Sequence, residues 1–143
     1  MKYVAKFILM LVYISNLTSQ IIEEHSLFDE DGHEVDVFAY QIPENYNLNN
    51  SHPLLVAFHQ WGGNQMSPFS TQFDDEANTR NWIFMSPYGG SPNNYNHQDA
   101  QEWVKLGIQW LIENYNIDER RIYMVGGSMG GASGAIYANN HLD

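Results

Sequence analysis

The spacing of hydrophobic residues along the chain changes between a period of two and a period near 3.6. Residues 34–40 alternate apolar and polar side chains, and the turn residues at 29–32 precede them. Alternation indicates a half-buried strand, so the region 23–41 is predicted to form a hairpin. Uninterrupted apolar runs are typical of strands that are buried on both faces of a parallel sheet. Such runs occur at residues 54–58, 82–86 and 122–125.

Helical spacing appears between and after these strands. Apolar residues recur at helical intervals in 99–115, and Asp99 and Glu102 at its start have the spacing of a capping box. Residues 73–80 and the small residues near the C-terminus also predict helices, and residues 116–121 are expected to form a turn. Buried strands that alternate with helices predict an α/β fold, a mostly parallel sheet with helices on both faces.

One serine lies in a glycine-rich turn between a predicted strand and a predicted helix. Gly126, Ser128 and Gly130 fit the G-x-S-x-G pattern of a nucleophile elbow. In such a turn the serine hydroxyl projects above the end of the sheet, and only very small residues fit two positions before and after it. Ser128 is therefore the candidate nucleophile, with Gly126 and Gly130 as the elbow glycines.

An attacking serine also needs donors for the oxyanion that forms on the substrate. The backbone N–H after the nucleophile, that of Met129, is one expected donor. The second is expected in the glycine-rich turn 59–63, which follows the apolar run 54–58. Within this turn the N–H of Trp61 is favoured over that of Gln60.

The general base is not evident in the sequence. His59 precedes the nucleophile, and at a strand end it is expected to orient the oxyanion turn rather than to act as the base. After Ser128 the chain contains one histidine and one acid, His141 and Asp143, which the predicted helix carries away from the elbow. The catalytic acid and histidine are therefore expected beyond residue 143, and the chain is expected to be the N-terminal part of a hydrolase domain (residues 20–143), truncated after the nucleophile helix.

Composition and charge restrict the partners. Residues 1–19 combine a basic start, an apolar stretch and a small polar end, which predicts a cleaved signal peptide and a secreted or periplasmic protein without stable membrane insertion. The net charge of −11 opposes binding to nucleic acid. The chain has no cysteine, and its histidines lack metal-ligand spacing on the predicted helices, so neither a metal nor a cofactor is expected.

With these residues identified, the chain resembles the α/β-hydrolase superfamily, and more narrowly the secreted esterases that include polyhydroxybutyrate depolymerases, feruloyl esterases and acetylxylan esterases. The resemblance covers nearly all of residues 42–143 and implies that Ser128 is the nucleophile and that Trp61 and Met129 line the oxyanion hole. The family usually has glycine where this chain has Gln60. The matching segments are 42–46, 53–59, 115–123, 126–131 and 140–143.

The resemblance favours a serine esterase that forms an acyl-enzyme on Ser128. The expected substrates are small or polymeric carboxylic esters, such as feruloyl or acetyl groups on polysaccharides, or polyesters. Gln60, Tyr88 and Tyr95 are the candidate substrate-binding residues, and the two tyrosines with Trp61 would form an apolar rim. Two alternatives remain open: a peptidase similar to prolyl oligopeptidase, which shares the elbow, and a non-catalytic truncated hydrolase.

Overall fold

The computed structural model describes residues 20–141. The predicted signal peptide, residues 1–19, and Asp143 lie outside this part of the chain. Five strands, three α-helices and one short 3₁₀ helix follow one another in the expected order. The elements are β1 (Glu23–Phe28), β2 (Glu34–Gln41), β3 (His52–Phe58), η1 (Ser67–Ser70), α1 (Phe73–Thr79), β4 (Ile83–Pro87), α2 (Gln98–Asn114), β5 (Ile117–Gly126) and α3 (Met129–His141).

The strands form one sheet in the order β1-β2-β4-β3-β5. β3 pairs in parallel with both β4 and β5, which confirms the parallel sheet predicted from the apolar runs. β1 and β2 form the predicted hairpin, and β2 pairs antiparallel with β4. The described sheet is mixed, because β2 runs opposite to the other four strands, while β1, β3, β4 and β5 share one direction.

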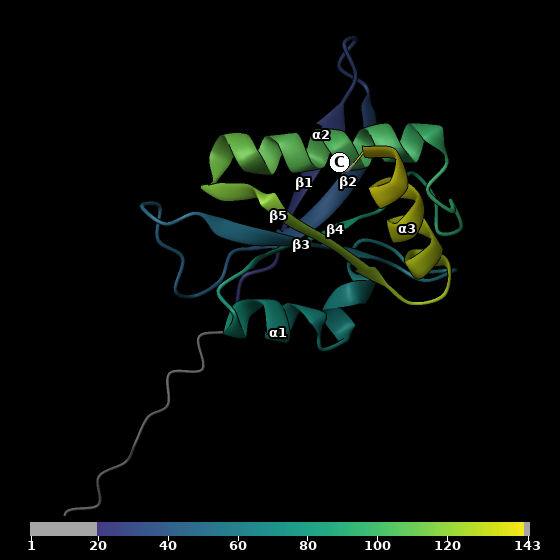
Figure 1. The fold of residues 1–143 in the computed structure, drawn as a ribbon. Helices are drawn as coiled ribbons and strands as arrows, with labels where there is room; N and C mark the ends of the chain where they lie inside the picture. The colour runs from purple at the N-terminus through teal and green to yellow at the C-terminus, as the bar shows by residue number, and fades with distance from the viewer. Residues whose placement is uncertain (1–19, 142–143) are drawn as a thin grey trace, which may run out of the picture.

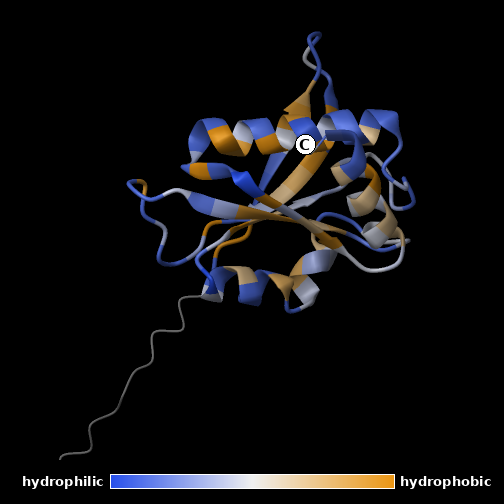
Figure 2. Cartoon of the chain, in the orientation of Figure 1, coloured by the Kyte–Doolittle hydropathy of each residue, from blue (hydrophilic) through white to orange (hydrophobic). Residues whose placement is uncertain are grey.

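Helices cover both faces of the sheet, as predicted. α2 and α3 lie on one face and the short α1 lies on the other (Figure 1). Figure 2 shows hydrophobic positions along the central strands and, alternating with hydrophilic ones, along α2. The larger core cluster includes Phe38, Leu54 and Leu111, and the smaller one beneath α1 includes Ala77 and Phe84.

Two predicted boundaries are wrong. Residues 116–121 were expected to be a turn, but β5 begins at Ile117, because its first residue pairs with His52 at the start of β3. α2 begins at Gln98 rather than after Asp99. Its N-cap is His97, whose side chain accepts the N–H of Ala100.

Candidate active site

The predicted nucleophile lies at the sharp turn between β5 and α3. Ser128 is exposed and has a left-handed backbone, with φ of +54°. That conformation costs a residue with a side chain about 1–2 kcal/mol. Because β3, β4 and β5 run in parallel, the turns that follow them gather at one edge of the sheet, where α/β proteins bind their ligands.

The two elbow glycines lie where backbones touch. A Cβ at Gly126 would lie 2.4 Å from the carbonyl carbon of Gly130, and one at Gly130 would lie 2.2 Å from the oxygen of Phe58. Both distances are far shorter than any contact that a real Cβ makes. The predicted need for glycine at both positions is confirmed, since α3 begins directly against the ends of β5 and β3.

The turn 59–63 therefore lies beside the start of α3. Gly63 donates its N–H to Gln60 O at 2.9 Å, and Gly62 donates to Pro92 O at 2.7 Å. Among the described residues, the N–H groups of Trp61 and Met129 have no acceptor. Both N–H groups are therefore free to bind a substrate oxygen. Their assignment as the oxyanion donors stays a prediction.

His59 is buried and orients the turn, as expected from its position. Its Nδ1 lies 2.9 Å from Gln60 O, and its Nε2 lies 2.8 Å from Tyr88 O. Both ring nitrogens face carbonyl oxygens, so neither is available to take a proton from Ser128. The Gln60 oxygen and the Trp61 N–H belong to one planar trans peptide and point in opposite directions. Fixing that oxygen therefore fixes the direction of the Trp61 N–H.

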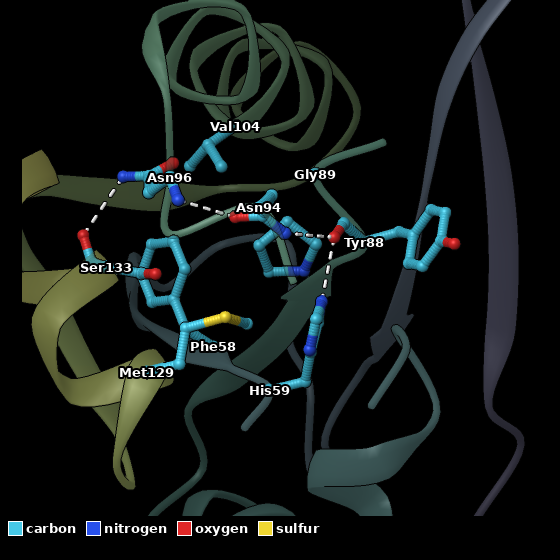
Figure 3. A pocket seen from close by; sticks show the side chains of 10 residues that line it. Phe58, His59, Tyr88, Gly89, Asn94, Asn96, Val104, Met129 and Ser133 are labelled. Carbon is cyan, nitrogen blue, oxygen red and sulfur yellow. Dashed lines mark hydrogen bonds between the residues drawn. The ribbon is translucent and has the colours of Figure 1, made fainter. Parts of the chain in front are cut away.

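The candidate substrate-binding residues separate into two places. The rings of Trp61 and Tyr95 lie 5.8 Å apart, and both are about half exposed, at 57% and 50%. The Tyr88 ring instead lies beside β2, where it lines a shallow hollow with Asp36 and Val37. Figure 3 shows this ring pointing away from Met129. Gln60 is exposed within its turn.

Four polar residues that were not predicted from the sequence brace the site. The buried carboxylate of Asp36 accepts the N–H groups of Gly89 and Gly90, at 3.0 and 2.9 Å. Burial raises the pKa of this carboxyl group, and these two N–H groups, that of Val37 and the charge of His59 partly oppose the rise. A sequence signal existed, because an acid lies on the same face of β2 as two aromatic residues. The other three are Asn94, Asn96 and Ser133.

Asn96 connects the loop 88–97 to α3 through Ser133, and Asn94 braces the loop internally. Asn96 is buried and donates from its Nδ2 to Ser133 O in α3 at 3.0 Å, and Asn94 donates to Tyr88 O at 2.9 Å. They line a cavity beneath the elbow, which also contacts Met129 (Figure 3). The space open to the centre of a water molecule is about 10 Å³. The cavity therefore has room for about one water, and Ser133 Oγ, which lines it, is buried without a hydrogen-bond partner.

No histidine or carboxylate in residues 20–141 is hydrogen-bonded to the Ser128 hydroxyl. His97 caps α2 and packs against Trp103. His141 lies at the far end of α3, where it stacks on Tyr137 and contacts Gln101. The position of His141 agrees with the expectation that the helix carries it away from the elbow.

The hairpin turn brings together the possible metal ligands Asp29, Asp31 and His33, which the sequence analysis had not singled out. All three are exposed, and Asp29 Oδ1 already accepts the N–H groups of the other two residues. These bonds account for the cluster as turn structure. None of the helices in residues 20–141 combines the length and the apolar character that crossing a membrane requires.

Comparison with known proteins gives a consistent result. A bifunctional acetylxylan esterase/xylanase from Neocallimastix patriciarum is 30% identical over 107 residues, which are 70% of this chain and 15% of that protein. An S-formylglutathione hydrolase from Agrobacterium tumefaciens superimposes with a TM-score of 0.69 at 12% identity, over 85% of this chain and 54% of that one. The CE1 ferulic acid esterase from the anaerobic fungus Anaeromyces mucronatus gives 0.64 at 14% identity, over 83% and 53%.

The chain thus spans about half the length of these two solved structures and a much smaller part of the curated relative. No family model matches it. Because the solved structures are only 12% and 14% identical to this chain, their superposition shows a likeness of fold alone. The chain therefore has the α/β-hydrolase fold, and its structural neighbours include esterases.

Proposed function

We propose that the protein is a serine hydrolase that cleaves carboxylic esters through an acyl-enzyme on Ser128. The observation that carries the proposal is the left-handed backbone of Ser128, in an exposed turn whose flanking glycines touch neighbouring backbone. A strained serine persists where the surrounding structure holds it, and such strain is concentrated at active sites. The esterases among the relatives support an ester as the substrate.

In this mechanism Ser128 Oγ attacks the ester carbonyl carbon, and its proton passes to a histidine that residues 20–141 do not supply. The carbonyl oxygen becomes an oxyanion, and the N–H groups of Met129 and Trp61 are the proposed donors to it. Collapse of the tetrahedral intermediate breaks the bond to the alcohol, which leaves with a proton. Water then attacks the acyl-enzyme, releases the acid and restores the Ser128 hydroxyl.

We assign the substrate rim to Trp61 and Tyr95. Two half-exposed rings 5.8 Å apart, beside the proposed oxyanion turn, suit an aromatic acyl group or a sugar. The proposed substrates are therefore feruloyl or acetyl esters on polysaccharides, with polyesters as the second class. Cleavage of such polymers would take place outside the cytoplasm, in keeping with the signal peptide predicted for residues 1–19.

The deciding experiment compares Ser128→Ala with the wild type in the protein encoded by the complete gene. Hydrolysis of p-nitrophenyl acetate and methyl ferulate should fall by about a thousandfold or more, because the nucleophile is removed. Ser70→Ala, an exposed serine in η1, should leave both rates unchanged. Retained turnover in Ser128→Ala would show that another residue is the nucleophile.

Two further outcomes identify the alternatives. Ser128-dependent cleavage of peptides but not of esters would favour a peptidase similar to prolyl oligopeptidase. A wild-type protein that cleaves neither class would favour the non-catalytic hydrolase. In an active esterase, Tyr95→Ala should raise KM for methyl ferulate about tenfold and leave KM for p-nitrophenyl acetate unchanged, because an aromatic contact contributes about 1 kcal/mol.

A further inference from the structure

A buried acid lies one strand away from the residues that surround Ser128. Asp36 on β2 is 5% exposed and lies two residues before Phe38, which pairs with Pro87 at the end of β4. Asp36 is thus beside the first residues of the loop 88–97. Its two carboxylate oxygens accept the N–H groups of Gly89 and Gly90, whose φ angles of +73° and +74° aim successive N–H groups at one anion.

The loop that Asp36 holds also holds the proposed oxyanion turn. On one side of Trp61, His59 contacts Tyr88 O, which directly precedes the two glycines. On the other side, Gly62 donates its N–H to Pro92 O at 2.7 Å. The peptide that carries the Trp61 N–H is therefore fixed at both ends by a loop whose first turn is fixed by Asp36.

The charge of this side chain is not explained by packing. Burying a carboxylate costs free energy, and its two N–H partners and the charge of His59 only partly offset that cost. The other titratable groups that surround it are Glu34 on its own strand and Tyr88 on the loop, and neither is a cation. An asparagine would fill the same volume without the charge. The charged form is needed because an ionised carboxylate accepts at both oxygens, whereas an amide offers one acceptor and two donors.

We propose that Asp36 is a positioning residue for the oxyanion hole. Its two acceptor oxygens fix the start of the loop 88–97, and that loop holds His59 and Gly62 so that the Trp61 N–H points to the substrate oxygen. The inference rests on the proposed esterase function for its effect on rate. Its structural part, the control of the turn 59–63 by a residue on β2, stands independently of that function.

The test compares Asp36→Asn with Glu34→Gln. Both variants replace one carboxylate by its amide on the same strand, but Glu34 is exposed, and the N–H groups of Gly89 and Gly90 are bonded to Asp36 instead. In the protein encoded by the complete gene, Asp36→Asn should lower kcat for p-nitrophenyl acetate about tenfold and leave KM within twofold. Deleting an oxyanion donor lowers kcat by about 10²- to 10³-fold, and a donor that is only misplaced should lower it by less. Glu34→Gln should retain the wild-type kcat.

The pH dependence of kcat distinguishes a loss of positioning from a general loss of structure. The ratio of wild-type to Asp36→Asn kcat should be largest at neutral pH and approach one as the pH falls, because protonation removes the same charge from the wild type. Burial raises the pKa of Asp36, so this ratio should change at a pH above the pKa of an ordinary aspartate. An unchanged kcat, a loss independent of pH, or an equal loss in Glu34→Gln would overturn the rate effect.

Amide hydrogen exchange in the same protein tests the structural part without turnover. Asp36→Asn should speed exchange at Gly62 by about tenfold, and Glu34→Gln should not change it. If exchange at Gly62 is unaffected, the inference is wrong. If the wild type shows no Ser128-dependent turnover but Asp36→Asn loosens Gly62, the proposed function fails and the coupling of Asp36 to the turn survives.

Discussion

Ser128 combines an exposed hydroxyl with a backbone conformation that its side chain disfavours. Glycine adopts φ of +54° without that cost, whereas alanine keeps it. We expect Ser128→Gly to raise the free energy of unfolding by about 1 kcal/mol and Ser128→Ala to change it by less than about 0.5 kcal/mol. Urea unfolding of both variants measures the difference. Equal stabilities would show that the left-handed turn carries no strain.

Gly130 allows α3 to begin against the end of β3. A Cβ there would overlap Phe58 O, a backbone atom that cannot move without shifting the strand. Gly130→Ala should therefore destabilise the fold by about 1–3 kcal/mol. Gly127→Ala is the matched control in the same turn, because nothing lies within 4 Å of its Cβ position. Denaturant unfolding that gave equal losses for both would contradict the close packing of the two backbones.

These residues differ in how far the sequence reveals them. The elbow could be predicted because its glycines and serine act within five consecutive positions. Asp36 could not be assigned a role, because its partner Gly89 is 53 positions away and the contact depends on the pairing of β2 with β4. The same holds for Asn96, whose partner Ser133 lies 37 positions away in α3. Spacing reveals local chemistry, but it does not identify side chains whose partners are set by topology.

At the scale of elements, α2 covers one face of the sheet together with α3. Leu111 is fully buried within the larger core cluster, whereas Leu106 on the same helix is 43% exposed. Leu111→Ala should cost about 2–5 kcal/mol of stability, because it leaves a cavity in the core. Leu106→Ala should change stability by no more than about 0.5 kcal/mol. Thermal or urea unfolding of the pair checks whether α2 packs through this face.

The order and type of the elements could be predicted, and their ends could not. Hydrophobic period is a property of consecutive residues, so it distinguished the buried strands from α2. The ends depend on contacts from elsewhere in the chain. β5 starts at Ile117 because β3 offers a partner there, and His97 caps α2 in place of the expected Asp99. The position of Tyr88 beside β2 also depends on how the loop 88–97 folds over the sheet.

At the scale of the whole molecule, the gathering of three parallel strand ends assembles the site. The turn 59–63, the loop 88–97 and the Ser128 elbow follow β3, β4 and β5, and hydrogen bonds link the first two to each other. Asp36 enters this assembly from the antiparallel hairpin. The hairpin therefore does more than extend the sheet, since it supplies the anion that the loop 88–97 folds around.

That anion makes the stability of the whole chain depend on pH in a defined direction. The folded state raises the pKa of Asp36 above its ordinary value of 3.8, so between the two values the folded chain binds more protons than the unfolded chain. The stability that Asp36 contributes is present at a pH below its ordinary pKa, and it is lost as the pH rises through the raised pKa of the folded state. Wild type should therefore lose stability relative to Asp36→Asn over that range, and the difference should level off at higher pH.

Urea unfolding of wild type, Asp36→Asn and Glu34→Gln at a series of pH values measures this difference, with the exposed Glu34 as the control for loss of one charge from β2. A wild type that gained stability over Asp36→Asn with rising pH would show that the charge stabilises the fold, and that stability alone accounts for its presence. The expected opposite slope means that Asp36 is ionised at neutral pH at a cost to folding. A residue that weakens the fold while holding the proposed oxyanion turn would be explained by what it does at the site.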